Sequence, residues 1–187
     1  MNYPNDLLKK VVQKLSENKI PHMICGSLAS SFHGTPRFTN DIDIVIYPSP
    51  SQLDKFIDSL GSDFYVSRQA VEDAMKNNQM FNIIDIASSG KIDLILRKNR
   101  PFSIEEFSRR KEYFLDNTAY CVVSPEDSIL SKLEWSKKTG SEMQFNDALN
   151  VSIVQGEKLD TGYLKKWAKE LGIDDQLEKL FKEAEKL

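Results

Sequence analysis

The chain has 187 residues, of which 40% are hydrophobic and 28% are charged, and its formal net charge at pH 7 is -3. Length and composition are those of a soluble globular protein with one domain, or one domain and a short helical extension, and they exclude a disordered chain. The slightly acidic balance excludes a protein whose whole surface binds duplex nucleic acid.

The predicted elements of the first 124 residues mix helices and strands. Apolar residues at helical spacing and capping residues predict helices over residues 5–18, 27–34, 49–61, 69–77 and 103–114. Alternating or continuous apolar runs predict strands over residues 21–25, 41–48, 63–68 and 119–124, and a β-hairpin over 80–97.

After residue 124 the pattern predicts helices alone. They cover residues 124–138, 142–154, 160–171 and 174–187. We therefore expect an α/β (α+β) fold with a mixed sheet flanked by helices in residues 1–124. A C-terminal helical region, residues 125–187, is expected to pack on it.

The two cysteines, Cys25 and Cys121, have neither the spacing of a zinc site nor the number of a disulfide framework. We expect both to be buried thiols in strands. The first residues lack the apolar run of a signal peptide, and no segment approaches the roughly 20 apolar residues of a membrane span. These features predict a cytoplasmic protein that does not enter a membrane.

Three carboxylates lie on two predicted strands. In "DIDIVI", Asp41 and Asp43 share one face because strand side chains alternate, and the isoleucines face the core. In "KIDLIL", Asp93 likewise lies on the face away from the apolar side chains. Like charges this close repel, and a divalent cation such as Mg²⁺ relieves the repulsion; three carboxylates on adjacent strands can hold two ions. Two ions can activate an attacking hydroxyl and stabilise a leaving pyrophosphate.

Gly26 and Ser27 lie between a predicted strand and a predicted helix. Glycine lets the backbone approach a phosphate, the serine adds a hydroxyl, and the helix N-terminus offers free N–H groups. The separation between Ser27 and Asp41 accommodates one helix and a return to the next strand. We therefore expect the phosphate-binding turn and the carboxylates to converge.

The role of Asp85 depends on the hairpin loop. With a loop of residues 88–90, Asp85 lies opposite Asp93 on the same face. There it supports the metal site by contacting the metal ligands and not the metal itself. A loop one residue shorter breaks that pairing. The sequence leaves both possibilities open.

The order of these motifs resembles a known signature. "GS", thirteen residues, "DID" and a later strand aspartate in "KIDLIL" resemble the nucleotidyltransferase superfamily. "PRFTNDID" resembles its small bacterial branch near the minimal nucleotidyltransferases and the AbiEii-type toxins. "FNIIDIASSGKIDLIL", "SPEDSILSKLEWSK" and "VQGEKLDTGYLKKWAKELGI" resemble an uncharacterised nucleotidyltransferase-like family of this size. The resemblance covers about residues 22 to 172.

The resemblance implies a Mg²⁺-dependent enzyme, with Mn²⁺ as a substitute, that moves a nucleoside monophosphate from an NTP to a hydroxyl. Its metal ligands and catalytic residues would be Asp41, Asp43 and Asp93, with Asp93 as the base. Gly26 and Ser27 would hold the triphosphate, and Lys132 would reach a phosphate. The acceptor could be a tRNA end, a protein or a small molecule, and the toxin resemblance adds an antitoxin partner. The alternative is a non-catalytic nucleotide- or partner-binding module on the same fold.

Three further residues have open roles. Arg37 and Thr39 precede the aspartates and either touch phosphate or brace the loop. Relatives carry arginines around an aspartate that matches Asp147, but Met143 and Asn146 stand in those places here. We therefore expect Asp147 to lack its basic partners.

Overall fold

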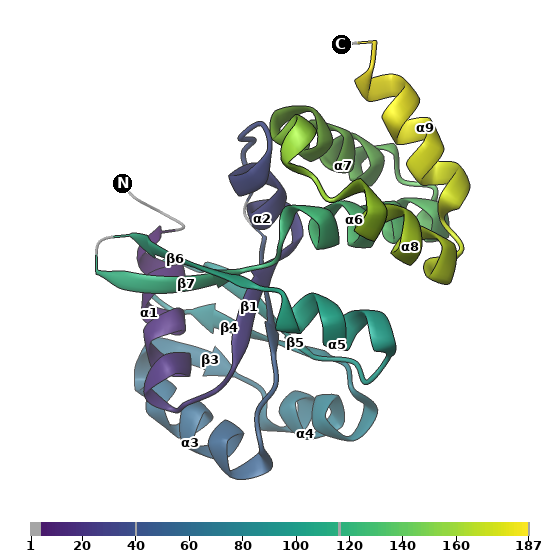
Figure 1. Ribbon diagram of the computed structural model, residues 1–187. Coiled ribbons are helices and arrows are strands. Elements are labelled where there is room, and N and C mark those ends of the chain that lie inside the picture. The colour runs from purple at the N-terminus through teal and green to yellow at the C-terminus, as the bar shows by residue number, and fades with distance from the viewer. Residues whose placement is uncertain (1–4, 40, 116, 187) are drawn as a thin grey trace. The chain divides into compact units, whose positions relative to one another are not determined.

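The computed structural model describes residues 5–39, 41–115 and 117–186 (Figure 1). The chain divides into two compact units. One joins the chain up to Cys25 with Thr39–Val122, and the other joins Gly26–Phe38 with the chain from Val123 onward. Residues 26–38 thus belong with the C-terminal helices, although in the chain they connect two strands of the first unit.

The first unit is built on a seven-stranded mixed sheet in the order β3-β4-β5-β2-β1-β7-β6. Its strands are β1 (His22–Cys25), β2 (Ile42–Ile46), β3 (Phe64–Val66), β4 (Met80–Asp85), β5 (Lys91–Leu96), β6 (Lys111–Leu115) and β7 (Thr118–Val122). β2 pairs with β5, and β1 with β7, in parallel; the other neighbours are antiparallel. The expected α/β (α+β) class with a mixed sheet and a C-terminal helical part is confirmed.

The helices of this unit follow the predicted apolar stripes. They are α1 (Asn5–Glu17), α3 (Pro50–Leu60), α4 (Arg68–Asn77) and α5 (Pro101–Ser108). The predicted serine cap of α3 is Ser49, whose hydroxyl accepts from the Gln52 N–H while the Gln52 side chain accepts from the Ser49 N–H. Ile42, Ile44 and Ile46 are at most 3% exposed, so the isoleucine face of β2 is core as expected.

The helix expected over residues 103–114 is wrong in its second half. α5 ends at Ser108, and Lys111–Leu115 forms β6 at the edge of the sheet. Only one side of β6 finds a neighbouring strand, β7, and Phe114 stays 73% exposed. The sequence KEYFL does not alternate between apolar and polar residues, so its pattern does not indicate a strand and pairing with β7 decides its conformation.

The predicted β4–β5 hairpin is confirmed, but its register differs from the one that would place Asp85 beside Asp93. Asn82 lies opposite Asp93, and the Asp85 N–H donates to the Gly90 carbonyl, so the loop is residues 86–89. Asp85 therefore falls on the other face, 5% exposed. There its carboxylate accepts from the N–H and the hydroxyl of Ser88 and closes the turn. The proposed support of Asp93 by Asp85 is wrong.

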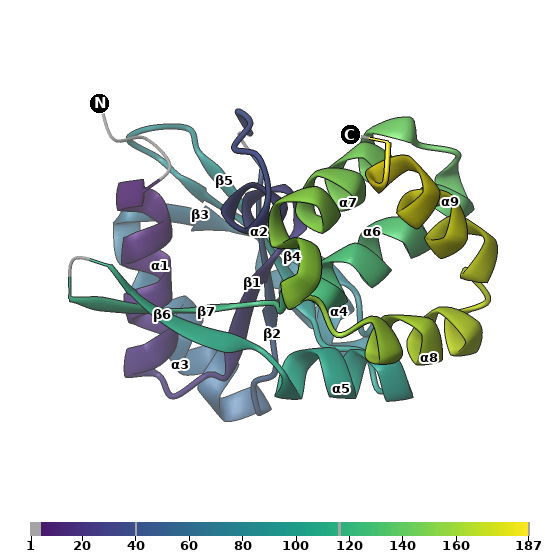
Figure 2. The same ribbon diagram turned by 45° about the horizontal axis from the view of Figure 1, so that its top comes forward.

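The second unit is helical. It contains α2 (Gly26–His33), α6 (Pro125–Thr139), α7 (Glu142–Gln155), α8 (Thr161–Leu171) and α9 (Asp174–Ala184), the last four of which Figure 2 shows together. α7 packs against α2, α6 and α9. The four C-terminal helices begin and end within a few residues of the predicted bounds. Within the described ranges, no helix combines the length and the hydropathy that a bilayer crossing requires.

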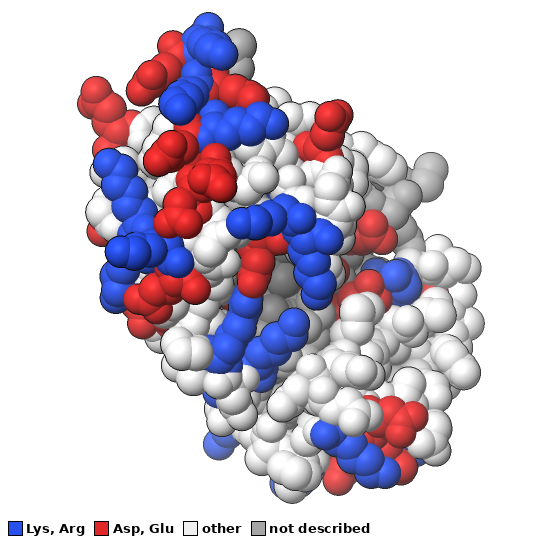
Figure 3. Space-filling view, turned by 90° about the vertical axis from the view of Figure 1, so that its right-hand side faces the viewer, with Lys and Arg blue, Asp and Glu red and all other residues white. Residues whose placement is uncertain are grey.

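The outer surface of α9 carries charge of both signs. Its residues include Asp174, Asp175, Lys179 and Glu183, and Lys179 approaches Glu183 at 3.8 Å one turn along. At the top of Figure 3, where α9 ends, blue and red side chains are interleaved. Such a mixed face keeps the helix solvated and does not form a basic patch for a polyanion.

α2 is held in the second unit by contacts with residues that are distant in the sequence. The His33 ring nitrogen Nε2 lies 2.6 Å from the Val123 carbonyl, and the Gln155 side chain donates to the His33 carbonyl. Gly34 follows directly, and a Cβ built on it would lie 2.9 Å from the backbone nitrogen of Val151 in α7. The close approach of the two backbones thus requires a glycine at residue 34.

We expect Gly34→Ala to lower the free energy of unfolding by about 1–3 kcal/mol, because the added methyl overlaps backbone atoms that cannot rotate away. Urea unfolding of the variant and the wild type measures the loss. Gly162→Ala is the matched control, since its Cβ would meet only the end of the Asp160 side chain, at 3.3 Å. Equal stabilities of the two variants would contradict the close approach at Gly34.

Candidate active site

The acidic end of the first unit is formed by two adjacent parallel strands. Asp43 of β2 and Asp93 of β5 are register partners, directly opposite one another. Asp43 is half-buried, and Asp93 is 8% exposed. Asp41 is exposed and lies just before the first residue of β2. The structure thus brings Asp43 and Asp93 side by side and leaves Asp41 at the entrance to the strand.

A lysine stands at this acidic end. Lys91 precedes Asp93 by two residues and shares its face, and its Nζ donates to Asp93 Oδ2 at 3.0 Å. This hydrogen bond, supported by the charges of Asp93, Asp41 and Asp43, raises the pKa of Lys91 above its ordinary value against the opposing effect of partial burial. One ammonium group therefore offsets part of the mutual repulsion of three carboxylates.

The residues of the acidic end fit a hard cation. Asp93 Oδ1 is buried and meets no hydrogen-bond donor among the described residues. Across residues 5–39, 41–115 and 117–186, no three His, Cys, Asp or Glu side chains are gathered closely enough to hold an ion together. Mg²⁺ needs only one or two protein carboxylates and takes its other ligands from water and phosphate. The Asp43–Asp93 pair with its unsatisfied oxygen meets that requirement.

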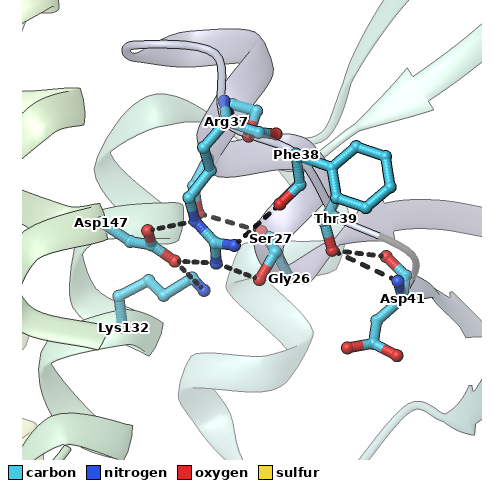
Figure 4. A network of polar contacts seen from close by, with 10 residues as sticks. Gly26, Ser27, Arg37, Phe38, Thr39, Asp41, Lys132 and Asp147 are labelled. Carbon is cyan, nitrogen blue, oxygen red and sulfur yellow. Dashed lines mark hydrogen bonds and ion pairs between the residues drawn. The ribbon is translucent and has the colours of Figure 1, made fainter. Parts of the chain in front are cut away.

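The loop before β2 is braced by Thr39. Its hydroxyl accepts from the Asp41 N–H at 3.2 Å and also lies 3.4 Å from the Asp41 carbonyl (Figure 4). Of the two roles considered for Thr39, the structure shows the bracing contact. A contact between Thr39 and phosphate stays a prediction.

The turn predicted to bind phosphate begins where β1 ends. Cys25 is the last residue of β1 and the register partner of Asp43. Gly26 follows it, opens α2 and has a φ of +64°, which glycine adopts without strain. The turn therefore starts one peptide bond after the residue that pairs with Asp43.

Both cysteines are half-buried rather than fully buried, and burial raises the pKa of Cys121 above its ordinary value.

The second unit holds a cluster of ionic side chains, which we call the Asp147 cluster: Asp147, Arg37, Lys132 and Ser27. Arg37 donates from Nε to Asp147 Oδ1 at 2.8 Å and from Nη2 to Oδ2 at 2.9 Å. Lys132 Nζ donates to the same Oδ2 at 2.8 Å. Arg37 Nη2 also donates to the Ser27 hydroxyl at 2.7 Å (Figure 4). A single carboxylate thus orients both cations.

The Asp147 cluster is buried and carries excess positive charge. The side chains of Asp147 and Lys132 are 5% and 6% exposed, and that of Arg37 is 33% exposed. Burial by itself would raise the pKa of Asp147, but hydrogen bonds from Arg37 and Lys132, with their charges, hold it below its ordinary value. Two cations against one anion leave one net positive charge beside the first turn of α2, which suits a phosphate.

The expectation that Asp147 lacks basic partners is wrong. Its partners come from Arg37 and Lys132, which lie 110 and 15 residues away in the sequence. Met143 and Asn146, where relatives carry arginines, are both exposed. The sequence does contain one indication of this pairing. Asp147 and Lys132 each fall on the apolar stripe of a helix, where burial of a charge requires a partner of opposite charge.

Comparison with solved structures finds this fold in nucleotidyltransferases. ANT(2")-Ia in complex with adenylyl-2"-tobramycin matches with a TM-score of 0.59 and 13% identity, over 88% of this chain and 96% of that one. An antigenic nucleotidyltransferase-like protein from Paracoccidioides brasiliensis matches with a TM-score of 0.58 and 17% identity, over 92% and 91%. The lincomycin-bound lincosamide antibiotic adenylyltransferase LnuA matches with a TM-score of 0.55 and 12% identity, over 80% and 96%.

At these identities the likeness establishes the fold alone. The fold is nucleotidyltransferase-like, as the order of the motifs predicted. No protein-family model matches the chain, and no curated protein matches it in sequence. The assignment to the branch near the AbiEii-type toxins stays a prediction.

We expect Asp147→Asn to lower the free energy of unfolding by about 3 kcal/mol near neutral pH, because Arg37 and Lys132 lose their shared anion. The folded-state pKa of Asp147 lies below its ordinary value, so the wild-type advantage is complete above that ordinary value. It is lost as the pH falls through the folded-state pKa. Urea unfolding of both proteins at a series of pH values from neutral to strongly acidic measures the difference.

Asp58→Asn is the matched control. Asp58 also pairs with an arginine, Arg68, but the two side chains are 67% and 66% exposed. Removing an exposed pair leaves stability within experimental error at every pH. A difference between wild type and Asp147→Asn that stays constant to the lowest pH would show that the lost ionisation is not its cause.

Proposed function

We propose that the protein is a metal-dependent nucleotidyltransferase that moves a nucleoside monophosphate from an NTP to a hydroxyl and releases pyrophosphate. One observation carries the proposal: Asp43 and Asp93 lie opposite one another with an unsatisfied buried oxygen, within a nucleotidyltransferase-like fold. A solvated pair of strand-end acids would have no reason to keep a carboxylate oxygen both buried and unbonded.

In this proposal, Asp41, Asp43 and Asp93 hold Mg²⁺, two ions in all, or Mn²⁺ in its place. Bound metal would neutralise the triphosphate and activate the hydroxyl. Asp93 accepts the proton of the acceptor hydroxyl, whose oxygen bonds to the α-phosphorus as the bond to pyrophosphate breaks. Asp43 would hold the metal ion beside the triphosphate.

The triphosphate is assigned to Gly26, Ser27, Arg37 and Lys132. The N–H groups of the first turn of α2 have no intrahelical acceptor and can donate to phosphate oxygens. Ser27 accepts its bond from Arg37, so the hydroxyl hydrogen can still be donated to a phosphate. Arg37 and Lys132 supply positive charge, and Asp147 sets their positions. Asp147 is thus a positioning residue in this proposal.

We expect Asp43→Ala to reduce label transfer from NTP by at least about 100-fold, because the metal loses a ligand. The assay supplies Mg²⁺ and each labelled NTP in turn, with total RNA, a protein extract or a panel of small hydroxyl compounds as acceptor. The panel includes tobramycin and lincomycin, which are bound by structural neighbours in adenylylated or free form. Asp54→Ala, an exposed aspartate of α3, is the control and keeps full transfer.

The result also decides between the two candidate functions. NTP binding without transfer to any acceptor class would replace the enzyme with a non-catalytic nucleotide-binding module. Absence of both binding and transfer would reject nucleotide chemistry at this site. Transfer that survives Asp43→Ala would place the reaction elsewhere.

We extend the proposal to a toxin that an antitoxin protein inhibits. Only the resemblance to AbiEii-type toxins supports this extension. We expect induced expression of the wild type in a bacterial host to arrest growth, and expression of Asp43→Ala at the same level to leave growth unchanged. Colony counts after induction measure the effect. Normal growth with active wild-type enzyme would remove the toxin role and leave the transferase in place.

A further inference from the structure

We propose that Lys91 is a built-in counter-cation, which pairs with Asp93 beside Asp43 before metal binds and is repelled from Asp93 by the charge of a bound metal ion. Its Nζ lies 3.0 Å from Asp93 Oδ2, on the face that Asp93 shares with Asp43. This inference rests on the proposed function, because it takes the carboxylate pair to be the metal site.

The sheet gives the pair no other charged neighbour on β4. The residues opposite Lys91 and Asp93 on that strand are Ile84 and Asn82, and neither is charged. The next cation along β5 is Arg97, four residues beyond Asp93 and thus about 13 Å away at the rise of a strand. Arg97 lies over the ring of Tyr47, at 4.0 Å from its centroid. Among these neighbours Lys91 is therefore the cation that contacts Asp93.

The contact is built to be reversible. The Lys91 side chain is 43% exposed, and a lysine stem is long and flexible, so the ammonium group can swing into water without opening the core. Lys132 shows the contrast, because its side chain is 6% exposed and remains inside the Asp147 cluster. A metal ion bound at Asp93 Oδ1 is therefore opposed by the charge of a tethered ammonium group at Oδ2 that can move away, and not by a fixed part of the fold.

Competition has a measurable consequence in the absence of any nucleotide. We expect Lys91→Met to bind Mn²⁺ about two- to fivefold more tightly than the wild type, the range that displacement of a part-exposed ion pair allows. Titration of the purified full-length chain, followed by the electron paramagnetic resonance signal of free Mn²⁺, measures the dissociation constant. Lys91→Arg keeps a cation in place and should match the wild type within about twofold.

Thermal unfolding gives a second readout. The effect of Lys91→Met on the melting temperature without metal should be opposite in sign to its effect on the shift that Mn²⁺ causes. Without metal, Lys91→Met should unfold at a lower temperature than the wild type, because Asp93 loses the ammonium group that offsets its repulsion from Asp43. With saturating Mn²⁺ the upward shift of the variant should exceed that of the wild type. A lysine that only supports the fold would lower the melting temperature in both conditions and leave the dissociation constant unchanged.

Two further variants separate this inference from the proposed function. Lys55→Met removes an exposed lysine of α3 and changes the net charge equally, so equal tightening there would reduce the effect to net charge and overturn the role of Lys91. Asp93→Asn should abolish Mn²⁺ binding. If it does and Lys91→Met binds like the wild type, the counter-cation is overturned and the metal site stands. If neither the wild type nor Lys91→Met binds Mn²⁺, both are overturned.

Discussion

Repulsion between Asp43 and Asp93 is the interaction around which the first unit is arranged. The two carboxylates are opposed because β2 and β5 pair in one register, and that register is fixed by the buried apolar face of each strand. A slip of one residue would turn the acids into the core and the isoleucines out of it. The sheet therefore cannot relax the repulsion by sliding, and only a counter-charge or a proton can lower it.

The two units handle charge in complementary ways. In the first unit, the acidic end sets the Asp43–Asp93 pair against one part-exposed lysine, so this pair with Lys91 carries one excess negative charge. In the second unit, the Asp147 cluster sets Arg37 and Lys132 against a single carboxylate, so the cluster carries one excess positive charge. A divalent cation complements the first arrangement, and a polyphosphate complements the second.

Local periodicity predicted most of the fold, and its failures have physical causes. The isoleucine face of β2, the hairpin and the serine-capped helix α3 follow from spacing that is repeated over several residues. Strand β6 was missed because its five residues are mostly exposed, so pairing and not patterning determines it. The side of the sheet on which Asp85 lies stayed open because the facing of a hairpin residue depends on the loop length, which the sequence "IASSG" does not fix.

The site was predicted better on strands than between helices. Alternation alone was enough to place Asp43 and Asp93 on one face, whereas the pairing of Arg37 with Asp147 spans 110 residues and follows from packing. Local spacing could not show it. The pairing could have been inferred from the free-energy cost of burying a lone charge. Because of that cost, any Asp or Lys on an apolar helical stripe requires a partner of opposite charge.

The position of residues 26–38 in the chain connects the two charge clusters through covalent structure. The chain leaves the sheet after Cys25, the register partner of Asp43, and returns at Thr39, which braces Asp41. Between these points it contributes Ser27 and Arg37 to the Asp147 cluster. The segment thus begins directly after the register partner of Asp43 and ends at a residue hydrogen-bonded to Asp41. The left-handed backbone at Gly26 is where the chain makes this exit, so the glycine in the "GS" pair serves the backbone first and any phosphate second.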